Sequence, residues 1–206
     1  MTKKKKKEHW RSRQNEESYF KESKKQKFRS RSAFKLIEID NKFRIFQPFI
    51  SILDLGASPG GWSQYSLSKL NDKGILIASD LLPMEKMDNV EFILGDFRKY
   101  ETQEAILYGN SMNKFDVIIS DISPSKTGNK VIDQYHFYNI ANEILEFSKK
   151  GLKSNGTIIM KVFMGIGFEE FNKESKTMFK KTTFFKPKSS RSESAETYLI
   201  ASSIRL

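Results

Sequence analysis

The sequence predicts an α/β fold: a doubly wound sheet of seven strands, mostly parallel, with an antiparallel hairpin at its C-terminal edge. Short apolar runs alternate with segments of helical period, a pattern typical of parallel strands covered by helices on both faces. The last two runs have no helical segment between them, so we expect them to pair antiparallel. The runs are residues 49–56, 74–80, 90–96, 115–121, 156–163, 182–187 and 196–203.

Helical segments separate the predicted strands. Residues 32–43 place apolar side chains at helical spacing behind a candidate Ser cap. Three further segments have helical period and length, namely residues 60–70, about 100–112 and 131–150. A chain of 206 residues fits one domain. We therefore expect residues 1–28 to form a basic, flexible arm and residues 29–206 to form a single domain.

The positive charge of the chain is concentrated in this arm. The net charge is +11 overall, and residues 1–35 alone hold 14 Lys and Arg against four Glu. Such an arm fits a polyanion, because Lys and Arg release the counterions condensed on phosphates, but a solvated tail that aids solubility explains the charge equally well. The arm also has aromatic side chains that could either stack on unpaired bases or pack on the domain, namely Trp10, Tyr19, Phe20 and Phe28. A second cluster, between residues 176 and 191, has six basic residues and no acid.

Composition disfavours several classes of protein. The absence of Cys excludes disulfides and Cys-based metal sites. His9 and His136 lie outside any metal-ligand spacing, so we expect no metal. No apolar stretch reaches the length of a membrane span, and the charged N-terminus lacks the apolar segment of a secretory signal. We expect a cytoplasmic monomer without membrane contact.

The stretch DLGASPGG, residues 54–61, follows the first predicted strand and leads into a helix. Gly56, Gly60 and Gly61 permit a positive φ or a close approach of backbone to ligand. In a doubly wound sheet, ligands bind outside the carboxyl ends of the strands. The stretch is therefore a candidate ligand loop, although a purely structural turn would have the same composition.

Acidic residues close the next three predicted strands. Asp80 lies 24 residues after Gly56, where an acid accepts hydrogen bonds from ribose hydroxyls. Asp96 is placed for an adenine amino group, and Asp121 closes the fourth strand. One strand-terminal Asp often only caps the next helix, but these ends converge on a single nucleoside-shaped crevice. NAD and S-adenosylmethionine both fit a ribose acid. The absence of a pyrophosphate fingerprint favours S-adenosylmethionine, whose sulfonium suits an acidic rim.

Lys161 interrupts the apolar run TIIMKVF, which is typical of a central strand. A buried Lys needs a partner, although a strand-end Lys can also extend its amine to solvent. In the functional interpretation, Lys161 lies in the crevice beside Asp121. Lys35 and Glu196 could join them in one cluster, which their spacing alone does not establish.

Seven stretches together carry a resemblance to a known family. They are RSRSAFKLIEID, ILDLGASPGGWSQY, ASDLLPME, LGDFR, FDVIISDISP, IIMKVF and KPKSSRSESAETYLIA, in this order from about residue 29 to 203. In this combination the chain resembles the FtsJ/RrmJ family of ribosomal RNA 2′-O-methyltransferases. The resemblance implies a Rossmann-like methyltransferase fold that uses S-adenosylmethionine. The implied substrate is a uridine ribose in the peptidyl-transferase region of large-subunit ribosomal RNA, within an assembled or nearly assembled particle.

The resemblance also implies roles for individual residues. The implied catalytic tetrad is Lys35, Asp121, Lys161 and Glu196. Lys161 would act on the 2′-hydroxyl, either as a neutral base or as a cation that stabilises the alkoxide. Glu196 is preferred to Glu193 because it directly precedes the last strand. With Gly56 at the start of the loop, the implied cofactor contacts are Gly60, Trp62, Asp80, Asp96 and Asp121.

Two further interpretations stay open. The same tetrad would serve a 2′-O-methyltransferase of the tRNA anticodon loop or of an mRNA cap. In a different class, the chain would be a non-catalytic RNA-binding factor in ribosome assembly. An inactive protein of that kind would have lost a tetrad member or a strand-end acid, and all of them are present here.

Overall fold

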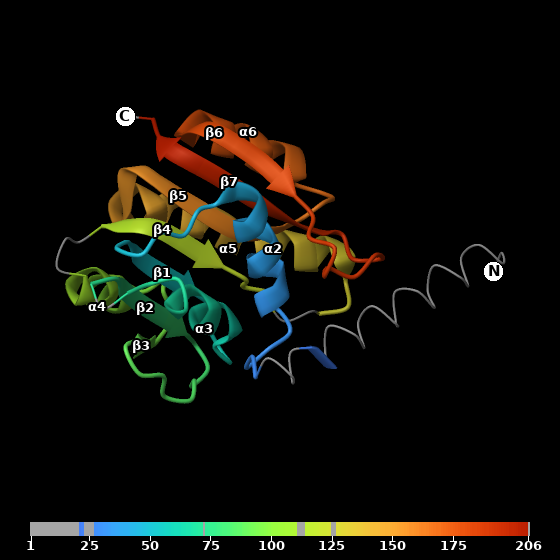
Figure 1. The fold of residues 1–206 in the computed structure, drawn as a ribbon. Helices are drawn as coiled ribbons and strands as arrows, with labels where there is room; N and C mark the ends of the chain where they lie inside the picture. Colours follow the sequence, from blue (N-terminus) through green and yellow to red (C-terminus); the bar gives the residue numbers. More distant parts are fainter. Residues whose placement is uncertain (1–20, 23–26, 72, 111–113, 125–126, 206) are drawn as a thin grey trace.

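The computed structural model of the chain describes residues 21–22, 27–71, 73–110, 114–124 and 127–205. Within these residues, seven strands form one sheet in the order β3-β2-β1-β4-β5-β7-β6 (Figure 1). The first five strands run parallel, and β7 is antiparallel to both β5 and β6. The predicted doubly wound sheet with its C-terminal hairpin is thereby confirmed. The strands are β1 (Ser51–Leu55), β2 (Ile75–Asp80), β3 (Glu91–Leu94), β4 (Phe115–Ser120), β5 (Leu152–Phe163), β6 (Phe179–Phe185) and β7 (Glu196–Ile204).

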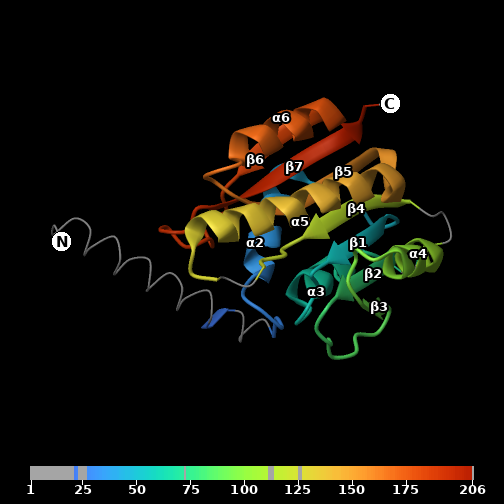
Figure 2. The same ribbon diagram turned by 180° about the vertical axis from the view of Figure 1, so that it is seen from behind.

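Helices cover both faces of the sheet, as Figures 1 and 2 show from opposite sides. Helices α2 (Ala33–Phe43) and α3 (Gly61–Leu67) pack on one face, where Leu36 and Ile39 join the core. The other face carries α4 (Tyr100–Gly109), α5 (Lys130–Gly151) and α6 (Phe168–Met178). Each face buries its own apolar cluster, which is why the central strand β1 is buried at all five positions.

The structure corrects several details of the predicted elements. Helix α6 was not predicted, because its amphipathic pattern lies in a segment dominated by charged residues. Strand β6 begins three residues before the predicted start at residue 182. Ser32 precedes α2 but makes no side-chain cap bond, and its hydroxyl instead lies 2.6 Å from that of Ser30. The side chain of Asn129 caps α5 by accepting hydrogen bonds from the first turn.

Most of the predicted arm, including Trp10, Tyr19 and Phe20, lies outside the described residues. Phe28 is described, and its ring packs edge-to-face against Phe34 of α2 at 5.7 Å. The arm's last aromatic residue therefore contacts the domain. None of the described helices combines the length and the hydropathy needed to cross a membrane.

The order of the strands fixes where a ligand can bind. The chain builds outward from β1 through β2 to β3, and then returns to place β4 on the other side of β1. This reversal leaves a crevice beyond the carboxyl ends of β1 and β4, where doubly wound proteins bind their ligands.

Candidate active site

A cavity of about 560 Å³ opens at this crevice. Gly56, Asp80, Asp96 and Asp121 all contribute to its wall. They follow or end β1, β2, β3 and β4, so the parallel register of the sheet carries them to one edge. The sequence-predicted crevice is thus a real cavity, with the predicted acids around it.

The loop after β1 depends on its glycines. Gly56 has φ +76°, and a Cβ there would lie 2.4 Å from Cγ1 of Ile122. Gly60 has φ +107°, and a Cβ would lie 2.8 Å from Sδ of Met84. Gly56 therefore excludes a side chain on grounds of space as well as backbone conformation, whereas at Gly60 the positive φ is the main obstacle.

Asp80 holds this loop against the one that follows β2. One carboxylate oxygen accepts the backbone N–H of Ser58 and the other that of Leu82, each at 2.8 Å. An ionised carboxylate offers about four acceptor positions. Asp80 can therefore fasten two loops and still accept hydrogen bonds from a ligand in the cavity.

Asp96 is paired with a residue that the sequence analysis missed. Arg98 donates to it from Nη2 at 2.6 Å and from Nε at 2.8 Å, and it too lines the cavity. These bonds outweigh desolvation and hold the pKa of Asp96 below its usual value. The carboxylate is thus ionised and oriented, with Arg98 beside it at the same end of the cavity.

The cavity fits a nucleoside cofactor such as S-adenosylmethionine. Its volume lies within the range of small-molecule sites, about 300–1,000 Å³. Ser79, which is 1% exposed, lines it with an Oγ that has no hydrogen-bond partner among the described residues. An orphaned hydroxyl of this kind points to a polar ligand. Phe97 and Ile140 give the cavity an apolar surface against which a nucleobase can pack.

Trp62 and Gly60 are not on the cavity wall as the structure describes it. Trp62 is 2% exposed, and its indole packs against Tyr198, with ring centroids 5.7 Å apart. Its Nε1–H donates to the carbonyl of Ser32 at 2.9 Å. Trp62 therefore links α3, which begins at the glycine loop, to the start of α2.

Lys161 lies on β5 with its amine directed at Asp121. Nζ is 2.9 Å from Oδ1 of Asp121 and donates to the backbone carbonyl of the same residue at 2.7 Å. The Lys161 side chain is only 7% exposed. Its burial is thus compensated by a partner, as a buried Lys requires.

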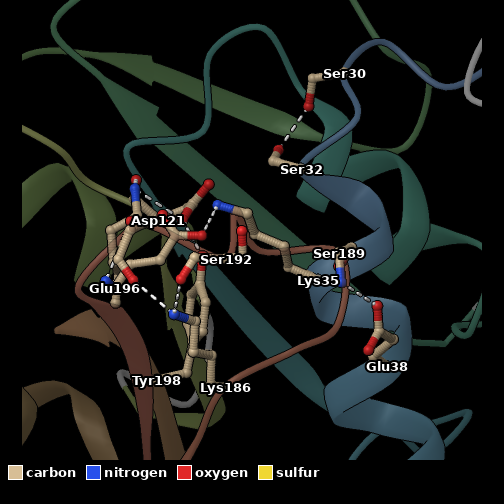
Figure 3. Close-up of polar contacts among 12 residues, drawn as sticks. Ser30, Ser32, Lys35, Glu38, Asp121, Lys186, Ser189, Ser192, Glu196 and Tyr198 are labelled. Carbon is tan, nitrogen blue, oxygen red and sulfur yellow. Dashed lines mark hydrogen bonds and ion pairs between the residues drawn. The ribbon is translucent and has the colours of Figure 1, made fainter. Parts of the chain in front are cut away.

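Lys35 reaches the same region from α2 and forms an ion pair with Glu196. The distance from its Nζ to Oε1 is 2.7 Å, and both side chains are nearly buried (Figure 3). Burial opposes the ionisation of Glu196. The ammonium of Lys35, helped by the Ser190 hydroxyl and by Lys161, nevertheless holds the pKa of Glu196 below its usual value. Glu193, the weaker sequence candidate, is exposed and accepts a hydrogen bond from Ser192.

Tyr198 joins these two pairs and was missed by the sequence analysis. Its hydroxyl donates to Oδ1 of Asp121 at 2.7 Å, and Nζ of Lys35 lies 5.8 Å from its ring centroid. Burial, reinforced by Asp121 and Glu196, raises the pKa of Tyr198 well above its usual value, so it remains a donor. The sequence did contain a signal for Tyr198. It lies two positions after Glu196 in a predicted strand, so the side chains of Tyr198 and Glu196 project from the same face.

Asp54 is a second missed acid, buried in β1. It is 1% exposed and accepts a 2.6 Å hydrogen bond from the hydroxyl of Ser63. Burial raises the pKa of Asp54 to about 7; Ser63 lowers it in part, and the Asp121 and Asp80 carboxylates raise it. The position of Asp54 inside the apolar run ILDL could have predicted a buried acid.

Known proteins are similar to this chain over most of its length. The FtsJ-like methyltransferase family matches residues 28–203. A "Ribosomal RNA large subunit methyltransferase E" of Buchnera aphidicola is 44% identical over 192 residues, which cover 93% of each chain. The protein of that name from Pelagibacter ubique is 43% identical over 95% of this chain and 96% of its own.

A solved structure is also similar. It is a Plasmodium falciparum protein assigned as a ribosomal RNA methyltransferase, with a TM-score of 0.78 and 30% sequence identity. The match covers 86% of this chain and 98% of that one.

Proposed function

This chain belongs to the FtsJ-like methyltransferase family, and we propose that it methylates a ribose 2′-oxygen of large-subunit ribosomal RNA with S-adenosylmethionine. The observation that carries the proposal is the pair of ammonium–carboxylate contacts beside the cavity, Lys161–Asp121 and Lys35–Glu196. Two buried amines at the edge of a nucleoside-sized cavity suit a reaction in which a hydroxyl loses its proton.

We propose that the cavity holds the cofactor through its strand-end acids. Asp80 would accept the ribose hydroxyls, Asp96 the adenine amino group, and Asp121 would face the methionine end. When bound, S-adenosylmethionine supplies an electrophilic methyl group on a sulfonium. Gly56 keeps the cavity wall free of a side chain at the start of the loop, and Trp62, just after the loop, joins α3 to Ser32.

Lys161 is proposed to bind the attacking 2′-oxygen. Its contacts with the carbonyl and with Oδ1 of Asp121 occupy two N–H bonds of its amine. The remaining position is an N–H in the ammonium and a lone pair in the amine. The ammonium would donate to the negative charge that develops on the 2′-oxygen while the hydroxyl proton passes to solvent, whereas the amine would accept that proton itself. A pH–rate profile distinguishes the two forms.

The other tetrad members position this group. Asp121 orients the Lys161 side chain and is itself held by Tyr198, and Lys35 with Glu196 forms the second, nearly buried ion pair. Alignment of the reacting atoms at about 3–3.5 Å supplies a large part of the rate in reactions of this type. A rigid, nearly buried tetrad is suited to that task.

The proposed target is a uridine in the peptidyl-transferase region of an assembled or nearly assembled large subunit. The names of the relatives support ribosomal RNA of the large subunit as the substrate. The loop between β6 and β7 adds Lys186, Lys188 and Arg191, whose charges suit phosphates. We further propose that residues 29–206 act as one methyltransferase domain, in a cytoplasmic monomer, with residues 1–28 as a basic arm.

The test is methyl transfer from labelled S-adenosylmethionine to purified large subunits, naked large-subunit RNA and tRNA. The proposal predicts label in the large subunit, recovered as 2′-O-methyluridine after nuclease digestion. Label in tRNA alone would favour the anticodon-loop enzyme. Absence of transfer to every substrate, by protein that binds S-adenosylmethionine, would favour the non-catalytic assembly factor.

A further inference from the structure

The loop between β6 and β7, residues 186–195, is held against α2 by Glu38. Oε2 of Glu38 accepts the backbone N–H of Lys188 at 2.6 Å, and Oε1 accepts that of Ser189 at 2.9 Å (Figure 3). These bonds join segments about 150 positions apart in the chain. Hydrogen bonds to an ionised carboxylate are roughly twice as strong as neutral ones.

The anchored loop leads directly into Glu196. Ser190, the residue after the anchor point, is buried close to the Glu196 carboxylate, whose pKa it helps to lower. Its backbone N–H bonds the carbonyl of Pro187 at 3.1 Å, which makes a tight turn around the two anchored amides. The hydroxyl of Ser194 accepts the backbone N–H of Glu196 at 3.2 Å. The loop is therefore a hydrogen-bonded unit that ends at a tetrad residue.

The same helix carries the partner of Glu196. Lys35 and Glu38 are three positions apart on α2, so their side chains lie on one face. Lys35 contacts the end of the loop through Glu196 at 2.7 Å, and Glu38 contacts its middle. Helix and loop are thus joined at two points, and the position of one point constrains the other.

We propose that Glu38 is a positioning residue for the methyl-transfer reaction, which holds Ser190 and Glu196 in place against Lys35. This inference rests on the proposed function. Without the carboxylate, the N–H groups of Lys188 and Ser189 lose their acceptors, and the loop loses its attachment to α2. Glu196 then keeps its ion pair but loses the fixed surroundings that orient it. Glu38 acts through Glu196 and not on the substrate itself.

The test compares Glu38→Gln, Glu196→Gln and the double variant, with Glu104→Gln on the exposed face of α4 as the matched control. Small misplacements of catalytic groups cost up to about 100-fold in rate, and we expect Glu38→Gln to lower kcat ~10-fold with unchanged affinity for S-adenosylmethionine. In the Glu196→Gln background, the same change should cost less than ~2-fold, because residues that act as a unit are not additive. Full, multiplicative losses would overturn the proposal.

Hydrogen exchange of the Lys188 and Ser189 amides gives a readout that does not need catalysis. Glu38→Gln keeps one acceptor oxygen and puts an NH2 group in place of the other, so it should speed the exchange of at least one of the two amides ~10-fold, whereas Glu104→Gln should leave them unchanged. Faster exchange together with a wild-type kcat would show an anchor without a positioning role and would overturn the inference. A wild-type protein that transfers no methyl group, yet shows protected amides, would instead refute the proposed function.

Discussion

Lys161 and Tyr198 both contact one carboxylate oxygen, Oδ1 of Asp121. The distances are 2.9 Å from Nζ of Lys161 and 2.7 Å from the hydroxyl of Tyr198. The two residues face each other directly across β5 and β7, so their side chains project from the same face of the sheet. Asp121, at the end of β4, is thereby held from two strands, and its carboxylate can orient the Lys161 amine.

Replacing Lys161 with Ala tests the proposed role of its amine. The change removes the group that would bind the 2′-oxygen, and we expect kcat to fall by about 10²–10⁴-fold. Single-turnover transfer of labelled methyl groups measures the loss. Calorimetry should give an affinity for S-adenosylmethionine close to that of the wild type. Near-normal turnover of the variant would reject both proposed roles of Lys161.

Replacing Tyr198 with Phe removes one hydrogen bond to Asp121 and keeps the ring against Trp62. A hydrogen bond to a charged group contributes about 1.5–3 kcal/mol, so we expect kcat to fall ~10–100-fold. The free energy of unfolding should fall by a comparable amount and no more, because the buried ring is retained. An unchanged kcat would mean that Tyr198 only fills space.

Replacing Asp80 with Ala should weaken the binding of S-adenosylmethionine. The change removes the proposed acceptor of the ribose hydroxyls and also releases the backbone N–H groups of Ser58 and Leu82. Lost hydrogen bonds of this kind predict a dissociation constant at least ~10-fold higher, measured by calorimetry. Asp88→Ala, an exposed acid in the segment between β2 and β3, is the control. Equal affinities of the two variants would count against this placement of the cofactor.

Asp54 predicts a pH dependence of stability. Its folded pKa of about 7 lies above the ordinary value of 3.8, so the folded protein binds the proton more tightly than the unfolded chain. The contribution of Asp54 to stability is complete at pH values below its ordinary pKa of 3.8. It is lost as the pH rises through its folded pKa of about 7. Asp54→Asn keeps an acceptor for Ser63 and removes the titration. We expect the variant to gain about 3 kcal/mol over the wild type between pH 5 and pH 8.

Denaturant unfolding at several pH values measures this difference. Asp116→Asn provides a contrast, because ionic and hydrogen-bond partners, Lys153 and Ser51, outweigh its burial and hold the pKa of Asp116 below its usual value. The ionised Asp116 carboxylate stabilises the folded protein at high pH. Asp116→Asn should therefore lose free energy of unfolding relative to the wild type as the pH rises. A constant difference between Asp54→Asn and the wild type across the range would contradict the assignment.

The sequence predicted the sheet and the acids at its edge because both depend on local patterns. Apolar runs that alternate with helical segments indicate the topology, and a parallel topology brings the ends of β2, β3 and β4 together. Asp80, Asp96 and Asp121 therefore line the cavity as expected. Helix α6 was missed since few of its residues are apolar, and only its packing on β6 reveals it.

Contacts between distant segments could not be derived from spacing. The pairing of Lys35 with Glu196 depends on how α2 packs on α3, which is fixed by the indole of Trp62 and by the hydrogen bond from Tyr65 to Asp40. The resemblance to a family named these residues, and the coordinates supply the distances. The Glu38 anchor had no sequence signal, because its partners are backbone N–H groups.

The central claim is that this chain methylates a uridine ribose of large-subunit RNA through Lys161. The most direct test maps ribose methylation by mass spectrometry in cells that lack the gene and in cells complemented with wild-type or Lys161→Ala protein. We predict that one 2′-O-methyluridine of the peptidyl-transferase region disappears with the gene and returns with the wild type alone. An unchanged methylation map, or full restoration by Lys161→Ala, would contradict the claim.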